Sequence, residues 1–458
     1  MNKIRFSHLP KEIKVLKFAA PGSKSITNRI LIVSALTQTR HNIKNILLSE
    51  DTLIMLNALS ALNINFSYCP ITRILKKNII CGKSSENKIY LGYAGTVYRF
   101  LLAFMMTLKG TYILQGEPEL HNRPITELVA ALNSIIKIGN IFEDSQNKLL
   151  KVNIQELKEK TSISVNPKKS SQFLTALLLI LPVLKNIDYI EAIEEPVSKT
   201  YIDLTLKLMK DTGVDIINKN YKKFYLADKL QDYKFDEYNV EGDFSGASYF
   251  FAVAAITGIY TIIENMDLLS AQGDKHLLDI LKKMNCEIEY DSKNKIFKIS
   301  RVKKLRAMGE IDMSTMQDVV PTLAVIALFA EGDTIITNIE NLKYKECDRF
   351  RAIITELQKI NADISYGSDW IKIRGKENYN SAEIDTYKDH RMAMAFSLLS
   401  LKINNITINE PEYVCKTFPD FFEQYLKLFE FENVKINYYS DIYRTQYELF
   451  CKNILEKS

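Results

Sequence analysis

Residues 52–66 read TLIMLNALSALNINF, an apolar helical pattern that stops at Asn63 and continues as an apolar strand. Asn and Gly tolerate the left-handed backbone conformation that ends many helices. The pattern occurs six times, and the residues that punctuate it are Asn63, Gly139, Gly213, Asn285, Asn361 and Asn433. Their successive separations are 76, 74, 72, 76 and 72 residues. Such a constant period predicts six copies of one structural unit.

A second series of apolar segments alternates with the first. Its members cover 21–36, 92–106, 170–184, 242–256, 316–330 and 389–401. Each starts with polar or small residues and is then apolar on nearly every side, which predicts buried helices. The free amides and partial positive charge of a helix N-terminus suit anions. Short β-rich runs fill the remainder, so we expect two α/β domains of three units each, with a break near residue 240.

The composition excludes several classes of protein. The 458 residues are 47% hydrophobic and 25% charged, which is typical of globular proteins. The net charge of +5 does not favour nucleic acid binding, which usually needs a concentrated basic face. No apolar run reaches the roughly 20 residues of a membrane span, and the charged start does not resemble an export signal. Six cysteines without CxxC pairs indicate free thiols in a reducing cytoplasm, not disulfides or a zinc site.

Polar residues with a common chemistry gather at the predicted helix starts and in nearby loops. Arginine is scarce, with 13 among 60 cations, and its planar fork matches carboxylate and phosphate groups. The candidates are Lys24, Ser25, Arg29, Gly95, Thr96, Arg99, Arg123, Ser170, Ser171, Gln172, Asp318, Lys345, Glu346, Arg349, Arg391 and Lys416. This set of cations, hydroxyls and two carboxylates predicts a site for small, multiply anionic substrates and acid/base chemistry.

Taken singly, several candidates have simpler explanations. Asp318 could cap a helix, Glu346 could form a surface ion pair, and His390 could be a structural histidine. Cys347 and Cys415 lack a paired base in the sequence, so we expect packing roles for them. The GSKS stretch at 22–25 lacks the spacing of a nucleotide-binding phosphate loop.

Taken together and in order, the motifs resemble the 3-phosphoshikimate 1-carboxyvinyltransferase (EPSP synthase) family. They are PGSKSITNR, LGYAGTVYRFL, NRPI, SSQFLTALL, EEPVSKTYI, VEGDFSGASYFFA, AQGD, LKYKECDR, DHRMAMAF and KTFPDFF, between about 18 and 430. The resemblance implies an inside-out α/β fold, in which two domains of three βαβαββ units close on the substrates and the buried helices point their N-termini at the interdomain cleft. It places residues 21–240 in one domain and residues 1–20 with 241–436 in the other. Residues 437–458 remain as a C-terminal extension, which we expect to be a packing helix.

The resemblance also implies a reaction and its residues. The family transfers the enolpyruvyl group of phosphoenolpyruvate to the 5-hydroxyl of shikimate 3-phosphate, without a metal or organic cofactor, and we expect a cytoplasmic monomer. Shikimate 3-phosphate would contact Ser25, Arg29, Ser170, Ser171, Gln172, Ser198, Tyr201, Asp318, Asn341 and Lys345. Phosphoenolpyruvate would contact Lys24, Gly95, Arg123, Gln172, Arg349, Arg391 and Lys416. Asp318 would accept the hydroxyl proton, while Glu346 and Lys24 would handle the proton at the methylene carbon.

Some positions depart from the family pattern. Tyr93 stands where Asn is usual, Thr200 replaces a Pro, and Lys343 and Cys347 replace Arg and Thr beside Glu346. Two alternative functions remain. The related transferase that acts on UDP-N-acetylglucosamine usually has a lysine–asparagine pair and a loop cysteine, whereas this chain has Lys24–Ser25 and no cysteine between Arg99 and Arg123. An inactive binding protein would not need every acid, base and cation of the set. The resemblance further implies inhibition by glyphosate in competition with phosphoenolpyruvate.

Overall fold

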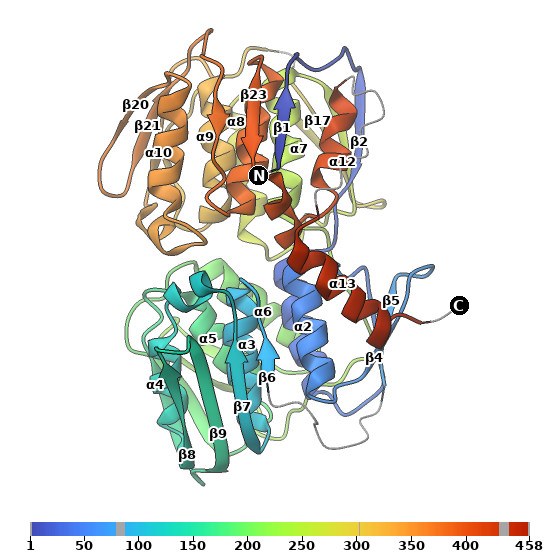
Figure 1. Ribbon diagram of the computed structural model, residues 1–458, viewed down its shortest axis with the longest axis vertical. Coiled ribbons are helices and arrows are strands. Elements are labelled where there is room, and N and C mark those ends of the chain that lie inside the picture. The colour runs from blue at the N-terminus through green and yellow to red at the C-terminus, as the bar shows by residue number, and fades with distance from the viewer. Residues whose placement is uncertain (1, 79–87, 302, 430–438, 457–458) are drawn as a thin grey trace. The chain divides into compact units, whose positions relative to one another are not determined.

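The computed structural model describes the chain except for residues 1, 79–87, 302, 430–438 and 457–458 (Figure 1). Its contacts divide the chain into two compact units. The first unit contains residues 22–240 and 442–458, and the second contains residues 1–21 and 241–441. They are called here the 22–240 unit and the 241–441 unit. The last residues, expected as a separate extension, thus group with the 22–240 unit.

The 22–240 unit alternates helices and short strands. Its helices are α1 Lys24–Leu36, α2 Glu50–Ala61, α3 Gly95–Phe104, α4 Thr126–Asn133, α5 Ser171–Ile180 and α6 Lys199–Asp211, together with α13 Asp441–Asn453 from Ile442 onward. Its strands are β3 Asn42–Lys44, β4 Phe66–Cys69, β5 Ile74–Lys77, β6 Lys88–Tyr90, β7 Gly110–Gln115, β8 Ile136–Asp144, β9 Leu149–Leu157, β10 Thr161–Val165, β11 Ile187–Ala192, β12 Ile216–Lys219, β13 Lys223–Leu226 and β14 Glu237–Asn239.

The first two repeats of the 241–441 unit follow the same order of elements. Its helices are α7 Phe244–Thr257, α8 Leu277–Lys283, α9 Val320–Leu328, α10 Arg349–Lys359, α11 His390–Ser397 and α12 Phe421–Tyr425. Its strands are β1 Lys3–Phe6, β2 Val15–Ala19, β15 Tyr260–Glu264, β16 Glu287–Asp291, β17 Ile296–Ser300, β18 Gly309–Asp312, β19 Asp333–Thr337, β20 Asp363–Tyr366, β21 Ile371–Arg374, β22 Glu383–Ile384 and β23 Ile406–Asn409.

In the part of the chain that the structure describes, the strands form six small sheets, three in each unit. The orders β6-β7-β9-β8, β10-β11-β13-β12 and β18-β19-β21-β20 each come from one continuous βαβαββ stretch. In each of these sheets the first two strands are parallel and a helix connects them, whereas the later pairs are antiparallel. The predicted α/β fold of repeated βαβαββ units is confirmed.

Two sheets take their first strand from a distant part of the chain. Strand β2 comes just before α1 in sequence, yet it pairs in parallel with β15, from Tyr260↔Val15 to Glu264↔Ala19. Strand β14 comes just before α7, yet it pairs in parallel with β3. The two strands have therefore exchanged partners between otherwise equivalent repeats. This exchange explains why residues 1–21 group with the 241–441 unit.

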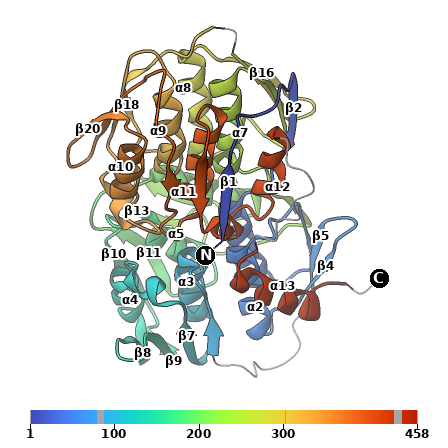
Figure 2. The ribbon, with the colours of Figure 1, turned by 45° about the horizontal axis from the view of Figure 1, so that its top comes forward.

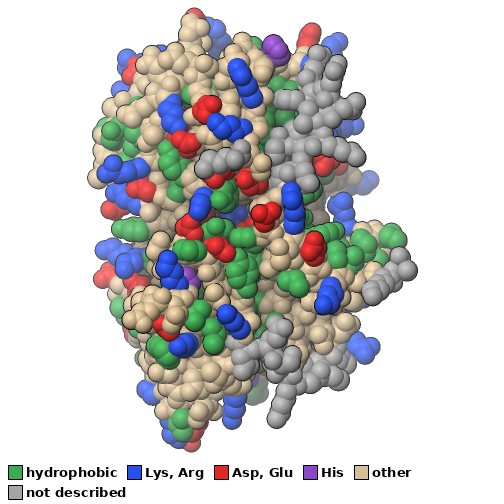
Figure 3. Space-filling model, viewed as in Figure 1, with side chains coloured by type: hydrophobic (Ala, Val, Ile, Leu, Met, Phe, Trp, Pro, Cys, Tyr) green, Lys and Arg blue, Asp and Glu red, His purple; other side chains and the backbone are tan. Residues whose placement is uncertain are grey.

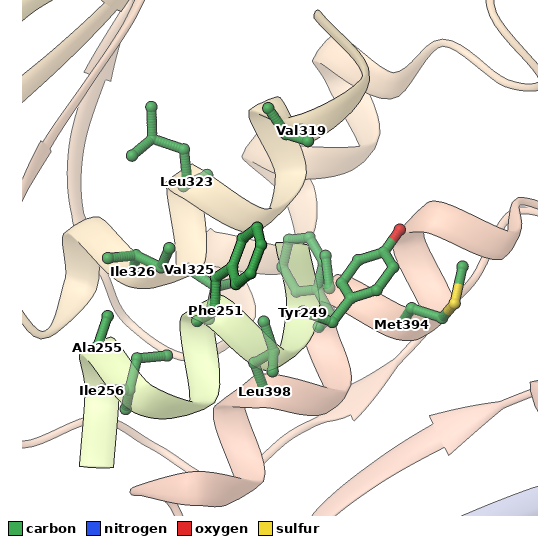
Figure 4. Packing of buried hydrophobic residues seen from close by; sticks show 14 of the residues in the cluster. Tyr249, Phe251, Ala255, Ile256, Val319, Leu323, Val325, Ile326, Met394 and Leu398 are labelled. Carbon is green, nitrogen blue, oxygen red and sulfur yellow. The ribbon is translucent and has the colours of Figure 1, made fainter. Parts of the chain in front are cut away.

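The predicted buried helices form the cores. Every residue of α3 and α9 is buried. Figure 4 shows the core of the 241–441 unit, where Phe251 of α7 lies among side chains of α9, including Val325, and near Leu398, the residue that follows α11. Truncating such a fully buried leucine to alanine costs about 2–5 kcal/mol. Figure 2 shows α7, α9 and α11 as neighbouring helices of this unit.

The helix ends confirm most of the predicted punctuation and correct one position. Asn63, Gly213, Asn285 and Asn361 have positive φ angles just after α2, α6, α8 and α10. Gly139 was wrongly placed at a helix end. Helix α4 already stops at Asn133, and Gly139 lies inside β8 at an irregularity in the β8–β9 register. Asn433 lies outside the described residues.

Surface and thiol features also bear on the sequence predictions. On the face shown in Figure 3, Lys and Arg side chains are interspersed with Asp and Glu side chains. Among the described residues, no helix is both long and apolar enough to cross a bilayer. Five cysteines, Cys69, Cys286, Cys347, Cys415 and Cys451, are free thiols, and Cys81 lies outside the described part of the chain.

Candidate active site

Lys24 begins helix α1 of the 22–240 unit and is held by a buried carboxylate. Its Nζ lies 3.3 Å from Oδ2 of Asp51, whose side chain is 2% exposed. Asp51 belongs to the first turn of α2, where Ser49 and Thr52 form a reciprocal cap. A carboxylate in the first turn is favoured by the positive end of the helix dipole. The first turn of α2 thereby positions Lys24 at the start of α1.

Arg29 lies one turn further along α1 and is almost fully buried. Its Nε donates to Thr205 Oγ1 at 2.9 Å, its Nη1 to the Ser25 carbonyl at 2.7 Å and its Nη2 to the Tyr201 carbonyl at 3.2 Å. Burial lowers the pKa of Arg29 to about 10, so the guanidinium remains charged near pH 7. These neutral oxygens fix the guanidinium without cancelling its charge. Arg29 thus connects Ser25 and Tyr201, two residues predicted to contact the same ligand.

Gln172 of α5 is oriented from two sides. Its Oε1 accepts a hydrogen bond from Arg99 Nη1 at 2.6 Å, and its Nε2 donates to Thr96 Oγ1 at 3.1 Å. Arg99 also donates to the Pro124 carbonyl through Nη2 at 2.7 Å. Since an amide can be flipped without visible change of shape, this pair of contacts determines which end is oxygen. Thr96 and Arg99 therefore position Gln172.

Gly95 and Arg123 meet at the first turn of α3. A Cβ atom placed on Gly95 would lie 2.4 Å from Arg123 Nη1 and 2.7 Å from its Cζ. The absence of a side chain therefore allows the guanidinium to approach the helix start. Tyr93, two residues earlier, is part of the same turn, and its carbonyl accepts the Gly95 amide at 3.0 Å.

The hydroxyl residues predicted to bind a ligand occupy the starts of α5 and α6. Ser170 caps α5, with its Oγ accepting the Gln172 amide at 3.3 Å, and Ser171 is the first residue of that helix. Ser198 precedes α6 in the left-handed conformation, at φ 51° and ψ 52°. A non-glycine residue in this region is uncommon and often marks a functional constraint.

In the 241–441 unit, Asp318 is surrounded by three cations. Its Oδ1 accepts from Lys345 Nζ and from Arg349 Nη1, both at 3.1 Å, and its Oδ2 accepts from Arg391 Nη2 at 3.0 Å. Burial by itself would raise the pKa of Asp318, but Arg391, Lys345 and Arg349 hold that pKa well below its usual range. Asp318 is therefore an ionised carboxylate at neutral pH and not a simple helix cap.

Arg349, the first residue of α10, contacts three carboxylates and is 1% exposed. Its Nε lies 2.7 Å from Asp389 Oδ2, its Nη2 lies 2.6 Å from Glu346 Oε2, and its Nη1 contacts Asp318. Lys416 Nζ approaches the other Glu346 oxygen at 3.9 Å. Glu346 is thus not a surface pair, because its side chain is only 12% exposed and lies between two buried cations.

Arg391 connects Asp318 to a second polar group. Its Nη2 also contacts Ser245 Oγ at 3.3 Å, and Ser245 donates to the carboxylate of Asp274. Burial and the nearby charge of Asp318 raise the pKa of Asp274 to about 6. Two neighbouring carboxylates thus have pKa values shifted in opposite directions, an arrangement found at acid/base sites.

Comparison with known proteins identifies the family. The family model described as EPSP synthase (3-phosphoshikimate 1-carboxyvinyltransferase) matches residues 11–425. A 3-phosphoshikimate 1-carboxyvinyltransferase of Colwellia psychrerythraea is 40% identical over 407 residues, covering 88% of this chain and 94% of the relative. The chain belongs to the EPSP synthase family. A relative of the same name from Vibrio vulnificus is 38% identical over 415 residues, 90% of this chain and 95% of its own.

Solved structures share the fold. EPSP synthase from Acinetobacter baumannii superposes with a TM-score of 0.75 at 22% identity, covering 93% of this chain and 98% of that one. The enolpyruvyl transferase NikO from Streptomyces tendae gives a TM-score of 0.69 at 14% identity, with coverages of 93% and 96%. The predicted enolpyruvyl transferase fold is therefore confirmed.

The remaining candidates of this EPSP synthase family member take supporting positions. Asn341 is half-buried in the 3-10 helix Glu340–Tyr344 that leads to Lys345. His390 is buried, with Nδ1 at 3.6 Å from Asp389 Oδ1. Burial and the Asp389 carboxylate raise the pKa of Cys347, so its thiol stays protonated. Cys415 is buried in the core.

The functional candidates and the residues that contact them form one group in each unit, called here the 22–240 cluster and the 241–441 cluster. Sequence reasoning missed several residues of these two clusters. Five residues hold the candidates in place but were not predicted as site residues: Asp51, Asp389, Thr205, Ser245 and Asp274. The sequence contained a signal for Asp389, because this residue stands at the start of a predicted buried helix. In the structure Asp389 caps α11 by accepting a hydrogen bond from the Arg391 amide at 2.8 Å. Within the described residues, no group of three or more His, Cys, Asp or Glu side chains is arranged to hold a metal ion.

Proposed function

We propose that the two clusters carry out the reaction of the EPSP synthase family on the same pair of substrates. The enolpyruvyl group of phosphoenolpyruvate passes to the 5-hydroxyl of shikimate 3-phosphate, and phosphate is released. The hydroxyl oxygen bonds to C2 while C3 gains a proton. C3 then loses a proton as the bond between C2 and the phosphate oxygen breaks, which leaves the enol ether. This reaction belongs to aromatic amino acid biosynthesis.

The observation that carries the proposal is the binding of Asp318 by Lys345, Arg349 and Arg391. In the free protein these cations make Asp318 a weak base. The phosphate and carboxylate groups of the substrates compete for the same cations, which raises the proton affinity of Asp318 when the 5-hydroxyl arrives. Asp318 then accepts that proton. Coupling of base strength to substrate binding suits general base catalysis.

Glu346 and Lys24 serve the methylene carbon. Glu346 lies between Arg349 and Lys416, so its carboxylate is fixed in orientation. Lys24 pairs with Asp51, which positions its side chain to deliver a proton or to balance an anion. Phosphoenolpyruvate is held by Lys24, Gly95, Arg123, Gln172, Arg349, Arg391 and Lys416. Multiply charged anions need such a set of cations when they leave water.

Shikimate 3-phosphate is held by hydroxyls, amides and cations from both clusters. Its ligands are Ser25, Arg29, Ser170, Ser171, Gln172, Ser198, Tyr201, Asp318, Asn341 and Lys345. Arg29 retains its charge while it orders Ser25 and Tyr201, which suits a phosphate or a carboxylate. We propose that the enzyme acts as a cytoplasmic monomer.

A direct assay tests the assignment. Purified protein is mixed with phosphoenolpyruvate and either shikimate 3-phosphate or UDP-N-acetylglucosamine, and phosphate release and the mass of the product are measured. We expect turnover with shikimate 3-phosphate and a product heavier by one enolpyruvyl group. Turnover with the nucleotide sugar alone would assign the chain to the related transferase. No turnover with either acceptor, despite ligand binding, would indicate a binding protein.

A further inference from the structure

Helix α13 lies beyond the part of the chain that matches the family, which ends at residue 425. It lies beside α2 in both ribbon views (Figures 1 and 2). Gln446 and Phe450 are its buried residues. Asn57 Nδ2 of α2 donates to the Gln446 carbonyl at 2.9 Å and to Gln446 Oε1 at 2.8 Å. The helix is therefore fixed to α2 at a defined register.

The residues after α13 are anchored to a sheet of the same unit. The Tyr68 amide donates to the Ile454 carbonyl at 2.8 Å, and the Glu456 amide donates to the Tyr68 carbonyl at 2.9 Å. The Tyr68 and Phe450 rings are 5.6 Å apart. Since this end has its own anchors on β4, contacts at the other end of α13 can be weakened without releasing the helix.

That other end reaches the turn before Asp51, which holds Lys24, and the turn before Gly95. The Tyr443 hydroxyl donates to the Leu48 carbonyl at 3.4 Å, three residues before Asp51. A Cβ atom on Gly92 would lie 2.8 Å from Ile54 Cδ1 of α2 and 3.6 Å from Ile442 Cγ2 of α13. Gly92 has φ +50° and begins the turn that continues to Tyr93 and Gly95. Thus α13 forms a hydrogen bond to the segment just before α2 and lies close to the turn before α3.

We propose that α13 is a positioning element for the phosphoenolpyruvate-binding groups of the 22–240 unit. Through Leu48 it fixes the turn from which Asp51 holds Lys24, and through Gly92 it fixes the turn that brings Gly95 to Arg123. A small displacement of a positioned cation weakens binding of a charged ligand, since charge-assisted contacts depend on short distances. The inference rests on the proposed function, because it takes Lys24, Gly95 and Arg123 as ligands of phosphoenolpyruvate.

The test is the triple variant Ile442→Ala, Tyr443→Phe, Gln446→Ala, which leaves Phe450 and the β4 contacts in place. The KM for phosphoenolpyruvate should rise about three- to tenfold, the effect of losing a few hydrogen bonds and packing contacts. The KM for shikimate 3-phosphate should change less than about twofold. The exposed residue Glu448 of the same helix provides the control Glu448→Gln, which should leave both constants unchanged.

A second readout does not depend on catalysis. Hydrogen exchange followed by mass spectrometry should show faster exchange at residues 48–52 and 91–96 in the triple variant, with β12 and β13 unchanged. Faster exchange with both KM values unchanged would overturn the proposal, because α13 would then be structural only. Equal rises of both KM values would also overturn it. If the triple variant does not fold, Gln446→Ala alone is measured against the same criteria. A wild-type protein that transfers no enolpyruvyl group refutes the proposed function instead.

Discussion

Arg29 and Arg349 are both buried arginines near helix starts, but their surroundings differ. Arg29, in the 22–240 unit, donates to a hydroxyl and two backbone carbonyls. Arg349, in the 241–441 unit, contacts the carboxylates of Asp318, Glu346 and Asp389. Burial lowers the pKa of Arg29 to about 10. For Arg349, burial acts in the same direction, but the three carboxylates raise its pKa overall.

The two surroundings imply different roles for the two arginines. A guanidinium fixed by neutral oxygens keeps its positive charge available to an anionic ligand. A guanidinium shared among three carboxylates instead holds those carboxylates in position, and removing it would leave buried charges without compensation. We therefore expect changes in the 22–240 cluster to act mainly on substrate affinity, and changes at the carboxylates of the 241–441 cluster to act mainly on turnover.

The largest expected effect is that of Glu346→Gln. Glutamine keeps the shape and can still accept a hydrogen bond from Arg349, but it cannot transfer a proton. Turnover should fall by about 10²–10⁴ while KM values change little. Steady-state phosphate release measures both constants. The control is Glu340→Gln, at an exposed position in the preceding 3-10 helix. Turnover close to that of the wild type would remove Glu346 from the mechanism.

Arg29→Lys should show the opposite pattern. Lysine retains the charge but cannot make the three separate contacts to Thr205, Ser25 and Tyr201. The KM for shikimate 3-phosphate should rise about tenfold to a hundredfold, with a smaller change in kcat. Arg40→Lys, at an exposed position after α1, is the matched control. A loss of kcat without a change in KM would contradict the division between the two units.

Gly95→Ala tests the placement of Arg123. The added methyl group would lie within 2.4 Å of the guanidinium, so Arg123 must move. The inhibition constant of glyphosate, measured at several phosphoenolpyruvate concentrations, should rise about tenfold, since a displaced cation binds both anions less well. Gly246→Ala has more room, with its nearest neighbour at 3.6 Å, and serves as the control. Unchanged inhibition would argue against this turn as part of the phosphoenolpyruvate site.

Tyr93→Asn tests the same turn from its other side. If the Tyr93 ring narrows the site, the variant should bind glyphosate more tightly than the wild type, by about twofold to tenfold. The same inhibition assay measures it. Glyphosate could already inhibit the wild type in competition with phosphoenolpyruvate, with the same inhibition constant as for the variant. That result would show that the Tyr93 ring does not limit access to the site.

Asp274→Asn should have the smallest effect, which is a change in thermal stability. The folded pKa of about 6 lies above the unfolded value near 3.8, so the folded protein loses stability as the pH rises between these values. Near pH 4, close to the unfolded pKa, most of this penalty has disappeared. The variant should therefore melt about 2–6 °C above the wild type at pH 7, with a much smaller difference at pH 4. Asp279→Asn, on an exposed part of α8, is the control. Equal melting temperatures at pH 7 would show that the other contacts of Asp274 outweigh its burial.

The periodicity of the sequence was sufficient to predict the repeated units. Local side-chain pattern determines whether a helix is buried, which is why α3 and α9 were predicted from their apolar composition alone. It also determines where Asn or Gly ends a helix, as at Asn63. The prediction failed at Gly139, because strand β8 begins earlier and uses the glycine at an irregular point of its register.

The sequence also supplied the chemistry of the candidate residues, because charge and hydrogen-bonding capacity belong to each side chain by itself. The partners were decided by the tertiary structure. Asp318 and Arg391 are 73 residues apart, and Arg29 and Thr205 are 176 residues apart, so no local pattern could pair them. The same holds for β2 and β14, which pair with strands far along the chain rather than with those of the adjacent repeat. Backbone hydrogen bonds form equally well between strands that are close and strands that are far apart in the sequence. Long-range packing selects which of the equivalent repeats pair, and this packing exists only in the folded chain.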